Sequence, residues 1–331
     1  MRSIDIHAHL MPQCLWRAFA TGDAWYGIRY EPGDGLGVAV NQEKRIALTP
    51  KLRFTPEERL KDMDEQGVDV QVVSIHTPFF SYHLDAAQGR QLARDVNDEI
   101  AAMTRQWPQR FAGLATLPVQ DVGAAVDELD RAVHVLGLKG VELDTVVHGH
   151  TWDEPQFLPL FKAAERMGAV LFYHPQPQNN FLMQRIKRHG LSNSLGVILD
   201  DAIVVGVLIC GGVLEKCPDL KVCIAHGGGP ACFAMGRLDR NWHDRPATRS
   251  TPQPPGAYQK RLYYDTVVPS EEALRFLLDR VGADRVVLGS DWPFVLWHPS
   301  PVAWVQNLKS LTPEEKEKIL WKNLAALLDI R

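Results

Sequence analysis

Short runs of apolar and β-branched residues recur along the whole chain. Runs of this length and composition, bounded by polar residues, glycine or proline, indicate buried β-strands. The runs cover residues 2–8, 69–75, 111–117, 139–144, 169–174, 221–226, 262–266 and 285–291.

Between most of these runs lie segments in which apolar residues recur at spacings of three and four, the period of an amphipathic helix. These segments cover residues 57–67, 91–107, 122–137 and 155–168. The regular alternation of strand and helix predicts parallel βαβ units, and eight repetitions favour a closed (β/α)8 barrel of the TIM type. We expect one domain over residues 1–331, with an open, doubly wound α/β sheet as the alternative fold.

Two segments interrupt the alternation. Residues 10–55 separate the first predicted strand from the first predicted helix and are rich in Trp, Gly and Pro, and residues 245–258 form a proline-rich connection before the seventh strand. Loops of this length in a compact domain tend to carry function or to be disordered. Because active sites of such barrels lie at the carboxyl ends of the strands, we interpret residues 10–55 as an insertion that covers the substrate.

The first predicted strand, IDIHAHL, carries two histidines that are two residues apart. Side chains alternate between the faces of a strand, so His7 and His9 are expected on one face and Ile6 on the other. Two imidazoles on one face can hold one metal ion. Alone, the pair is equally well explained as polar residues near a chain end.

Other residues of metal-binding type stand at the ends of further predicted strands. His174 ends the fifth run, His226 the sixth and Asp291 the eighth. The strand ends of a barrel meet, so the cluster predicts a site for zinc or a similar divalent ion that leaves room for water or substrate. One of the imidazoles is then available as a catalytic acid or base.

The composition limits the kinds of molecule that this protein is expected to bind. The chain has 36 Lys and Arg against 40 Asp and Glu, a formal charge of −4 and no basic block, so nucleic acid is not an expected partner. Apolar runs stop short of the ~18 residues that span a bilayer, and no signal pattern is evident, so we expect a cytoplasmic protein without a membrane partner. The five cysteines form no C-x-x-C pair, which disfavours a thiolate zinc site.

Several motifs together resemble one known superfamily of metal enzymes. They are H-x-H at His7 and His9, His174-Pro175, H-G-G-G from His226, GRLDRNW at 236–242 and LGSDWPF at 288–294. With these motifs, the chain resembles the amidohydrolase superfamily and, within it, the aminocarboxymuconate semialdehyde decarboxylase family. The resemblance runs in order from residue 4 to Asn323.

This resemblance implies a (β/α)8 barrel with one divalent metal ion, commonly zinc, and no organic cofactor. The implied metal ligands are His7, His9, His174 and Asp291, with Asp291 also counted among the catalytic residues. His226 would be the acid or base that activates metal-bound water. The implied reaction is non-oxidative loss of CO₂ from an unsaturated or aromatic carboxylate, such as 2-amino-3-carboxymuconate 6-semialdehyde or a hydroxybenzoate. A cation and positioned donors stabilise the electron density left on carbon.

The resemblance also implies substrate-binding residues and a homodimer. Arg237 matches a family arginine that enters the site of the neighbouring subunit and binds the substrate carboxylate. A second family arginine falls on Ala47 in an ungapped alignment, and the nearby basic residues are Lys44, Arg45 and Arg53. Of these we expect Arg45 to bind substrate, together with Trp292 and Phe294.

Two other classes of function remain open. A hydrolase of an amide, ester or lactone, or a hydratase of an oxo-dicarboxylate, would use the same groups. Binuclear hydrolases of the superfamily usually carry a carboxylated lysine at the end of strand four, but Lys139 starts that strand, which leaves Glu142 as a possible bridging group. A purely structural barrel is disfavoured, because a structural zinc site closed by four ligands needs no further titratable group beside it.

Overall fold

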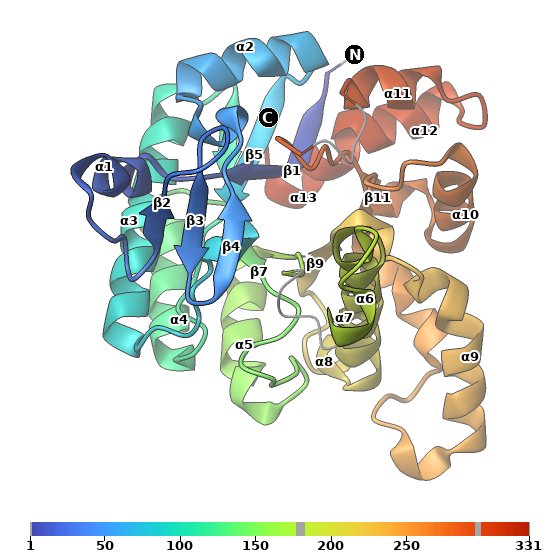
Figure 1. The fold of residues 1–331 in the computed structure, drawn as a ribbon. Helices are drawn as coiled ribbons and strands as arrows, with labels where there is room; N and C mark the ends of the chain where they lie inside the picture. Colours follow the sequence, from blue (N-terminus) through green and yellow to red (C-terminus); the bar gives the residue numbers. More distant parts are fainter. Residues whose placement is uncertain (1, 177–182, 295–298, 331) are drawn as a thin grey trace.

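The computed structural model of the chain describes residues 2–176, 183–294 and 299–330. The strands are β1 (Ile4–Leu10), β2 (Arg29–Glu31), β3 (Val38–Asn41), β4 (Lys44–Ala47), β5 (Val70–Ile75), β6 (Phe111–Gly113), β7 (Gly140–Leu143), β8 (Val170–Tyr173), β9 (Lys221–Ile224), β10 (Tyr263–Asp265) and β11 (Val286–Val287). The α-helices are α1 (Gln13–Thr21), α2 (Pro56–Gln66), α3 (Ala86–Gln106), α4 (Val122–Asp130), α5 (Leu158–Met167), α6 (Met183–Ile186), α7 (Val197–Cys210), α8 (Val213–Lys216), α9 (Ala231–Asp244), α10 (Glu271–Val281), α11 (Pro301–Asn307), α12 (Pro313–Glu317) and α13 (Asn323–Leu328). Figure 1 shows the longer helices arranged around the strands, an α/β fold.

The parallel strands are hydrogen-bonded to one another in chain order. One sheet has the order β1-β5-β6 and a second has the order β7-β8-β9-β10-β11. A parallel bridge between Ala115 and Val141 joins the two sheets, and a parallel bridge between Ala8 and Trp292 returns to β1. All of the predicted strand runs therefore contain a parallel strand, and their carboxyl ends lie together.

The helices begin and end where local sequence signals place them. At the start of α2, Thr55 and Glu58 form a capping box, and Gly67 ends the helix in the left-handed conformation with a φ of 75°. Helix α3 begins earlier than residue 91, because the Asp85 side chain accepts a hydrogen bond from the backbone N–H of Gln88 and caps the helix there.

Strand β1 departs from strict alternation. Its register against β5 shifts between Asp5 and Ala8, which is the mark of a β-bulge. Ile6 packs in the same interior cluster as Phe172, and the His7 ring centroid lies 5.2 Å from that of Phe172. The expectation that Ile6 points away from His7 is therefore wrong, since the bulge brings both side chains to the interior.

The segment between β1 and α2 has structure of its own. It contains α1 and an antiparallel sheet of the order β2-β3-β4. In Figure 1 this sheet, in blue, lies beside α1 and apart from α9 and α10. The proline-rich residues 245–258 contain two short 3-10 turns, Pro246–Thr248 and Pro255–Ala257.

One helical stretch of the fold is long and apolar. The helical stretch Ser192–Cys210 has 19 residues and a mean hydropathy of 1.9, which by length and composition alone is enough to cross a membrane. Asp200 and Asp201 interrupt this stretch, so its uninterrupted apolar runs stay shorter than the ~18 residues that span a bilayer. Asp201 of α7 is fully buried and hydrogen-bonded to His226, whereas Ile203 is exposed, so one side of α7 packs against the rest of the fold.

Candidate active site

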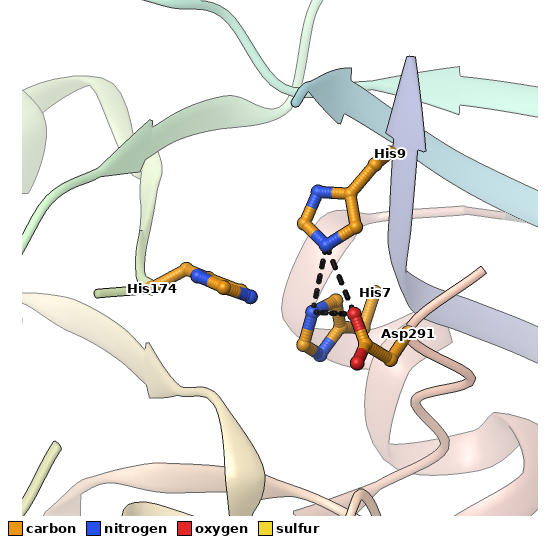
Figure 2. A group of neighbouring side chains, drawn as sticks. All are labelled: His7, His9, His174 and Asp291. Atoms are coloured by element: carbon orange, nitrogen blue, oxygen red, sulfur yellow. Dashed lines mark hydrogen bonds and ion pairs between the residues drawn. The ribbon is translucent and has the colours of Figure 1, made fainter. Parts of the chain in front are cut away.

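Two histidines of β1 approach each other in the interior of the fold. His7 and His9 are fully buried, and their Nε2 atoms are 3.2 Å apart (Figure 2). The bulge in β1 and the two-residue spacing together direct both rings to the same interior space. The expected common face of His7 and His9 is confirmed.

His174 and Asp291 join the pair from other strand ends, as Figure 2 shows. His174 directly follows β8, and its Nδ1–H donates a hydrogen bond to the carbonyl oxygen of Pro175 at 2.8 Å. This bond leaves the Nε2 lone pair of His174 directed at the cluster, where it is buried without a partner in the described part of the chain. Asp291 follows β11 at a left-handed φ of 54°, which is tolerated better by aspartate than by most residues.

The spacing of these donor atoms fits a single metal ion. Asp291 Oδ1 lies 3.3 Å from His7 Nε2 and 3.1 Å from His9 Nε2. One ligand atom from each of His7, His9, His174 and Asp291 lies within 4.8 Å of the others. Tetrahedral donors at about 2.1 Å from an ion are about 3.4 Å apart. The unpartnered Nε2 of His174 and the close approach of the other donors therefore suit a divalent cation.

A carboxylate behind His7 fixes the orientation of that ring. Asp265, at the end of β10, accepts a hydrogen bond from His7 Nδ1–H at 2.6 Å. Its other oxygen accepts from the backbone N–H groups of Gly227 and Val267. Carboxylates in this position set the tautomer of a ligating histidine and raise its basicity. Sequence reasoning missed Asp265, although its place at the end of the seventh predicted strand was a usable signal.

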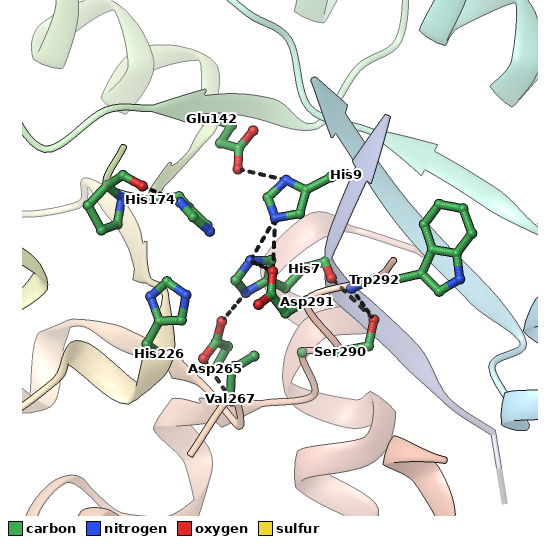
Figure 3. A network of polar contacts seen from close by, with 12 residues as sticks. His7, His9, Glu142, His174, His226, Asp265, Val267, Ser290, Asp291 and Trp292 are labelled. Carbon is green, nitrogen blue, oxygen red and sulfur yellow. Dashed lines mark hydrogen bonds and ion pairs between the residues drawn. The ribbon is translucent and has the colours of Figure 1, made fainter. Parts of the chain in front are cut away.

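His226 lies beside the four ligand residues and outside their set. Its ring centroid is 4.8 Å from that of His174 and 5.3 Å from that of His7 (Figure 3). Asp201 of α7 accepts a hydrogen bond from His226 Nδ1–H at 2.9 Å, which leaves Nε2 as the reactive nitrogen. Sequence reasoning also missed Asp201.

The turn after His226 has a backbone that only glycine fits. Gly229 has a φ of 53°, and a Cβ there would lie 1.9 Å from the Ile198 carbonyl oxygen. His226 itself has a φ of 50°. The H-G-G-G motif therefore lets the chain pass close to α7, where Asp201 meets His226.

Burial and neighbouring charges give these side chains different protonation states. Burial lowers the pKa of His174 well below its usual value and that of His9 to about 4, so both rings are neutral at pH 7. Burial opposes ionisation of Asp291, but hydrogen bonds and charge from His7, then from His9, hold the pKa of Asp291 well below its usual range. The cluster therefore offers two neutral imidazoles, those of His9 and His174, and one carboxylate, which are ligands suited to a divalent cation.

The two remaining imidazoles are held by carboxylates. Burial alone would lower the pKa of His7, but hydrogen bonds to Asp265 and Asp291 raise it well above its usual value. Burial also opposes protonation of His226, yet the charge and hydrogen bond of Asp201 raise the pKa of His226. At His7, the carboxylates that attract a proton equally attract a divalent cation, which competes for the same nitrogen.

A cavity of about 230 Å³ opens beside the cluster. Its lining includes His9, His174, His226 and Asp291, together with Arg45, Ala47, His76 and Phe294. The Phe294 ring centroid lies 5.4 Å from that of His9, so this aromatic side chain borders the cavity next to the histidine cluster. The segment between β1 and α2 reaches the cavity through β4.

The basic residues considered for substrate binding occupy different places. Arg45 lines the cavity, and its guanidinium is paired with Glu31 at 2.6 Å. Lys44 lines a neighbouring cavity of about 640 Å³, and Arg53 lies over the Trp16 ring. Arg237 is exposed on α9 and does not line the cavity of its own chain.

Trp292 does not contact the cavity. Its ring stacks on the Arg59 guanidinium at 3.9 Å, and its indole N–H donates to Asp62. Figure 3 shows the side chain pointing away from the histidine cluster. The prediction that Trp292 binds substrate is therefore wrong, because the residue after Asp291 points to the opposite side of the chain.

Comparisons with known proteins agree with this geometry. A family model described as Amidohydrolase matches residues 4–330. The 2-amino-3-carboxymuconate-6-semialdehyde decarboxylase of Dictyostelium discoideum is 29% identical over 340 residues, covering 99% of this chain and 91% of the relative. The gamma-resorcylate decarboxylase of Polaromonas sp. is 25% identical, covering 86% of this chain and 90% of the relative.

A solved structure adds a match over the full length of the fold. The 5-carboxyvanillate decarboxylase of Sphingomonas paucimobilis superposes with a TM-score of 0.85 at 25% identity, covering 100% of this chain and 99% of that one. The family model covers nearly the whole chain, including every residue of the metal-ligand cluster. The chain therefore belongs to the amidohydrolase family and resembles its aminocarboxymuconate semialdehyde decarboxylase members, as the motifs indicated.

Proposed function

We propose that this protein is a metal-dependent, non-oxidative decarboxylase of an unsaturated or aromatic carboxylic acid. The observation that carries the proposal is the position of His226, oriented by Asp201 and lying beside four convergent metal-ligand residues at a small cavity. Relatives that act on 2-amino-3-carboxymuconate 6-semialdehyde and on gamma-resorcylate support the substrate class. We infer that the eight parallel strands form a (β/α)8 barrel and that residues 10–55 cover the substrate over it.

The donor set supports one divalent ion, and we propose zinc, with manganese and cobalt compatible with the same ligands. A solved decarboxylase from Polaromonas, described as a dihydroxybenzoic acid decarboxylase, holds manganese. When bound, the ion supplies positive charge that stabilises electron density developing on the substrate.

The side chains of this chain perform the proton chemistry. In a decarboxylation the bond between the carboxyl carbon and its neighbour breaks, its electron pair stays on that neighbour, and the neighbour takes up a proton as CO₂ leaves. His226 Nε2 is placed to deliver that proton, while Asp201 holds the ring and stabilises its protonated form. His76, Phe294 and Ala47 form the cavity wall that orients the planar substrate and limits access of water.

Asp201→Asn tests the orienting role. Asparagine keeps the size of the side chain but loses its charge, so the pKa of His226 falls and its reactive tautomer is less well defined. We expect a loss of about tenfold or more in kcat, and the limb of the pH–rate profile that His226 controls moves to lower pH. A profile of kcat/KM against pH that matches the wild type would contradict this role.

Arg237 supports a proposal about assembly, because its exposed position on α9 leaves it free of the cavity in its own chain. We propose that it binds the substrate carboxylate in the site of a second copy, within a homodimer. Arginine suits this task because its planar fork of donors matches a carboxylate.

Co-expression of His226→Asn and Arg237→Ala chains tests this arrangement. Each variant alone should be inactive, whereas a mixed dimer has one site with both a native His226 and a native Arg237. Random pairing in a two-fold dimer should restore about one quarter of wild-type activity. If isolated mixed dimers show no restored activity, Arg237 does not act in the site of the second copy.

Release of CO₂ is the direct test of the reaction. We expect the zinc-loaded protein to release CO₂ from one of 2-amino-3-carboxymuconate 6-semialdehyde, 2,6-dihydroxybenzoate and 5-carboxyvanillate, measured by membrane-inlet mass spectrometry. Chelated protein and His226→Asn serve as controls. Metal-dependent cleavage of a lactone or amide, or hydration of an oxo-dicarboxylate, without CO₂ release would favour the hydrolase or hydratase alternative.

A further inference from the structure

A buried carboxyl group of β7 has no function in the chemistry described so far. Glu142 is fully buried beside the Ser74 hydroxyl, and in the described part of the chain neither of its carboxyl oxygens has a hydrogen-bond partner at normal distance. The Nδ1 atom of His9 lies 3.9 Å from Glu142 Oε1. That nitrogen is also buried without a partner. Two complementary polar groups thus face each other in an interior where an unpaired polar atom costs free energy.

The two nitrogens of His9 face opposite groups, as Figure 3 shows. Nε2 approaches His7 and Asp291, whereas Nδ1 approaches Glu142. Glu142 therefore lies behind the ring, away from the mutually close ligand atoms. From this position it does not bridge a second ion to the first, as the binuclear alternative would require.

The imidazoles of His7, His174 and His226 each have one nitrogen fixed by an acceptor. Asp265 holds His7 at 2.6 Å, the Pro175 carbonyl holds His174 at 2.8 Å, and Asp201 holds His226 at 2.9 Å. For His9, Glu142 is the group that can serve in this way. Either protonation state of a carboxyl group offers an acceptor oxygen.

We propose that Glu142 is the positioning residue of His9, accepting a hydrogen bond from Nδ1–H and so directing Nε2 at the metal ion. A side-chain adjustment that shortens the present contact by about 1 Å gives a normal hydrogen bond. This inference rests on the metal site of the proposed function. Loss of such an outer partner typically weakens metal binding by about 10–100-fold.

Metal affinity measured by chelator competition tests the proposal without turnover. Glu142→Leu removes the acceptor, and Glu142→Gln keeps an acceptor oxygen of similar reach. Glu128→Gln is the matched control, because Glu128 is another buried carboxylate but is bound to Asn97 and Arg131. We expect Glu142→Leu to weaken zinc binding by about 10–100-fold and Glu142→Gln by no more than about threefold, with the control unchanged.

A folded Glu142→Leu protein with wild-type zinc affinity would overturn the proposal. Should that variant fail to fold, long-range ¹H–¹⁵N NMR of the zinc-loaded wild type and Glu142→Gln decides instead. A proton on His9 Nδ1 whose shift changes in Glu142→Gln supports the contact, and an unchanged shift contradicts it. Because neither readout involves CO₂ release, failure of the decarboxylase proposal is distinguished from failure of this one.

Discussion

Replacing His226 with asparagine is expected to lower the rate of CO₂ release by about 10²–10⁴-fold, the contribution typical of a positioned acid or base. Asparagine is the appropriate substitution because residue 226 has a φ of 50°, a conformation that asparagine tolerates and alanine does not favour. The variant should still bind one metal ion, since His226 lies outside the ligand set. The measurement is kcat for CO₂ release alongside metal content by mass spectrometry.

Two outcomes would contradict this assignment. A His226→Asn protein with activity within about tenfold of the wild type would show that another group moves the proton. Loss of the metal in a folded variant would show that His226 is a ligand. Circular dichroism provides the control for folding in both cases.

Replacing His174 with alanine is expected to have an effect of similar size for a different reason. The Nε2 atom of His174 is buried, has no hydrogen-bond partner in the described residues and can offer its lone pair to a metal ion. The substitution therefore removes a ligand and enlarges the adjacent cavity. Loss of a residue that only hydrogen-bonds to a metal ligand typically weakens metal binding by about 10–100-fold. Loss of the ligand His174 should weaken zinc binding by more than this, and the rate of CO₂ release should fall as well. Chelator competition and the CO₂ assay measure the two effects.

His134→Ala is the matched control for this experiment. His134 is an exposed imidazole that pairs with Asp130 on the surface, far from the ligand set in the sequence and outside the site cavity. It should retain wild-type affinity and activity. Equal metal content in His174→Ala and wild type would remove His174 from the ligand set.

The sequence predicted the strands and the cluster because both depend on strong, local signals. Alternation of apolar strands with helices places His174 and Asp291 at strand ends, and those ends meet in the fold. Asp201 was not predicted because α7 is apolar on almost all sides. The sequence of α7 therefore shows no helical periodicity that would indicate a carboxylate facing inward. Asp265 was not predicted because the role of a single aspartate at a strand end cannot be assigned before its hydrogen-bond partner is known.

Other differences arose from features that periodicity does not encode. The bulge in β1 places Ile6 and His7 on the same side, although a regular strand would separate them. The turn after Asp291 sends Trp292 onto Arg59 instead of into the cavity. Both depend on backbone irregularities, one within β1 and one after β11, where tertiary packing decides the direction of a side chain.

Anomalous diffraction at the metal edge, from crystals of zinc-loaded protein, tests the central claim most directly. We predict one peak, coordinated by His7, His9, His174 and Asp291, with His226 beside it and uncoordinated. Two peaks bridged through Glu142, or a metal bond to His226, would contradict the account and favour a hydrolase.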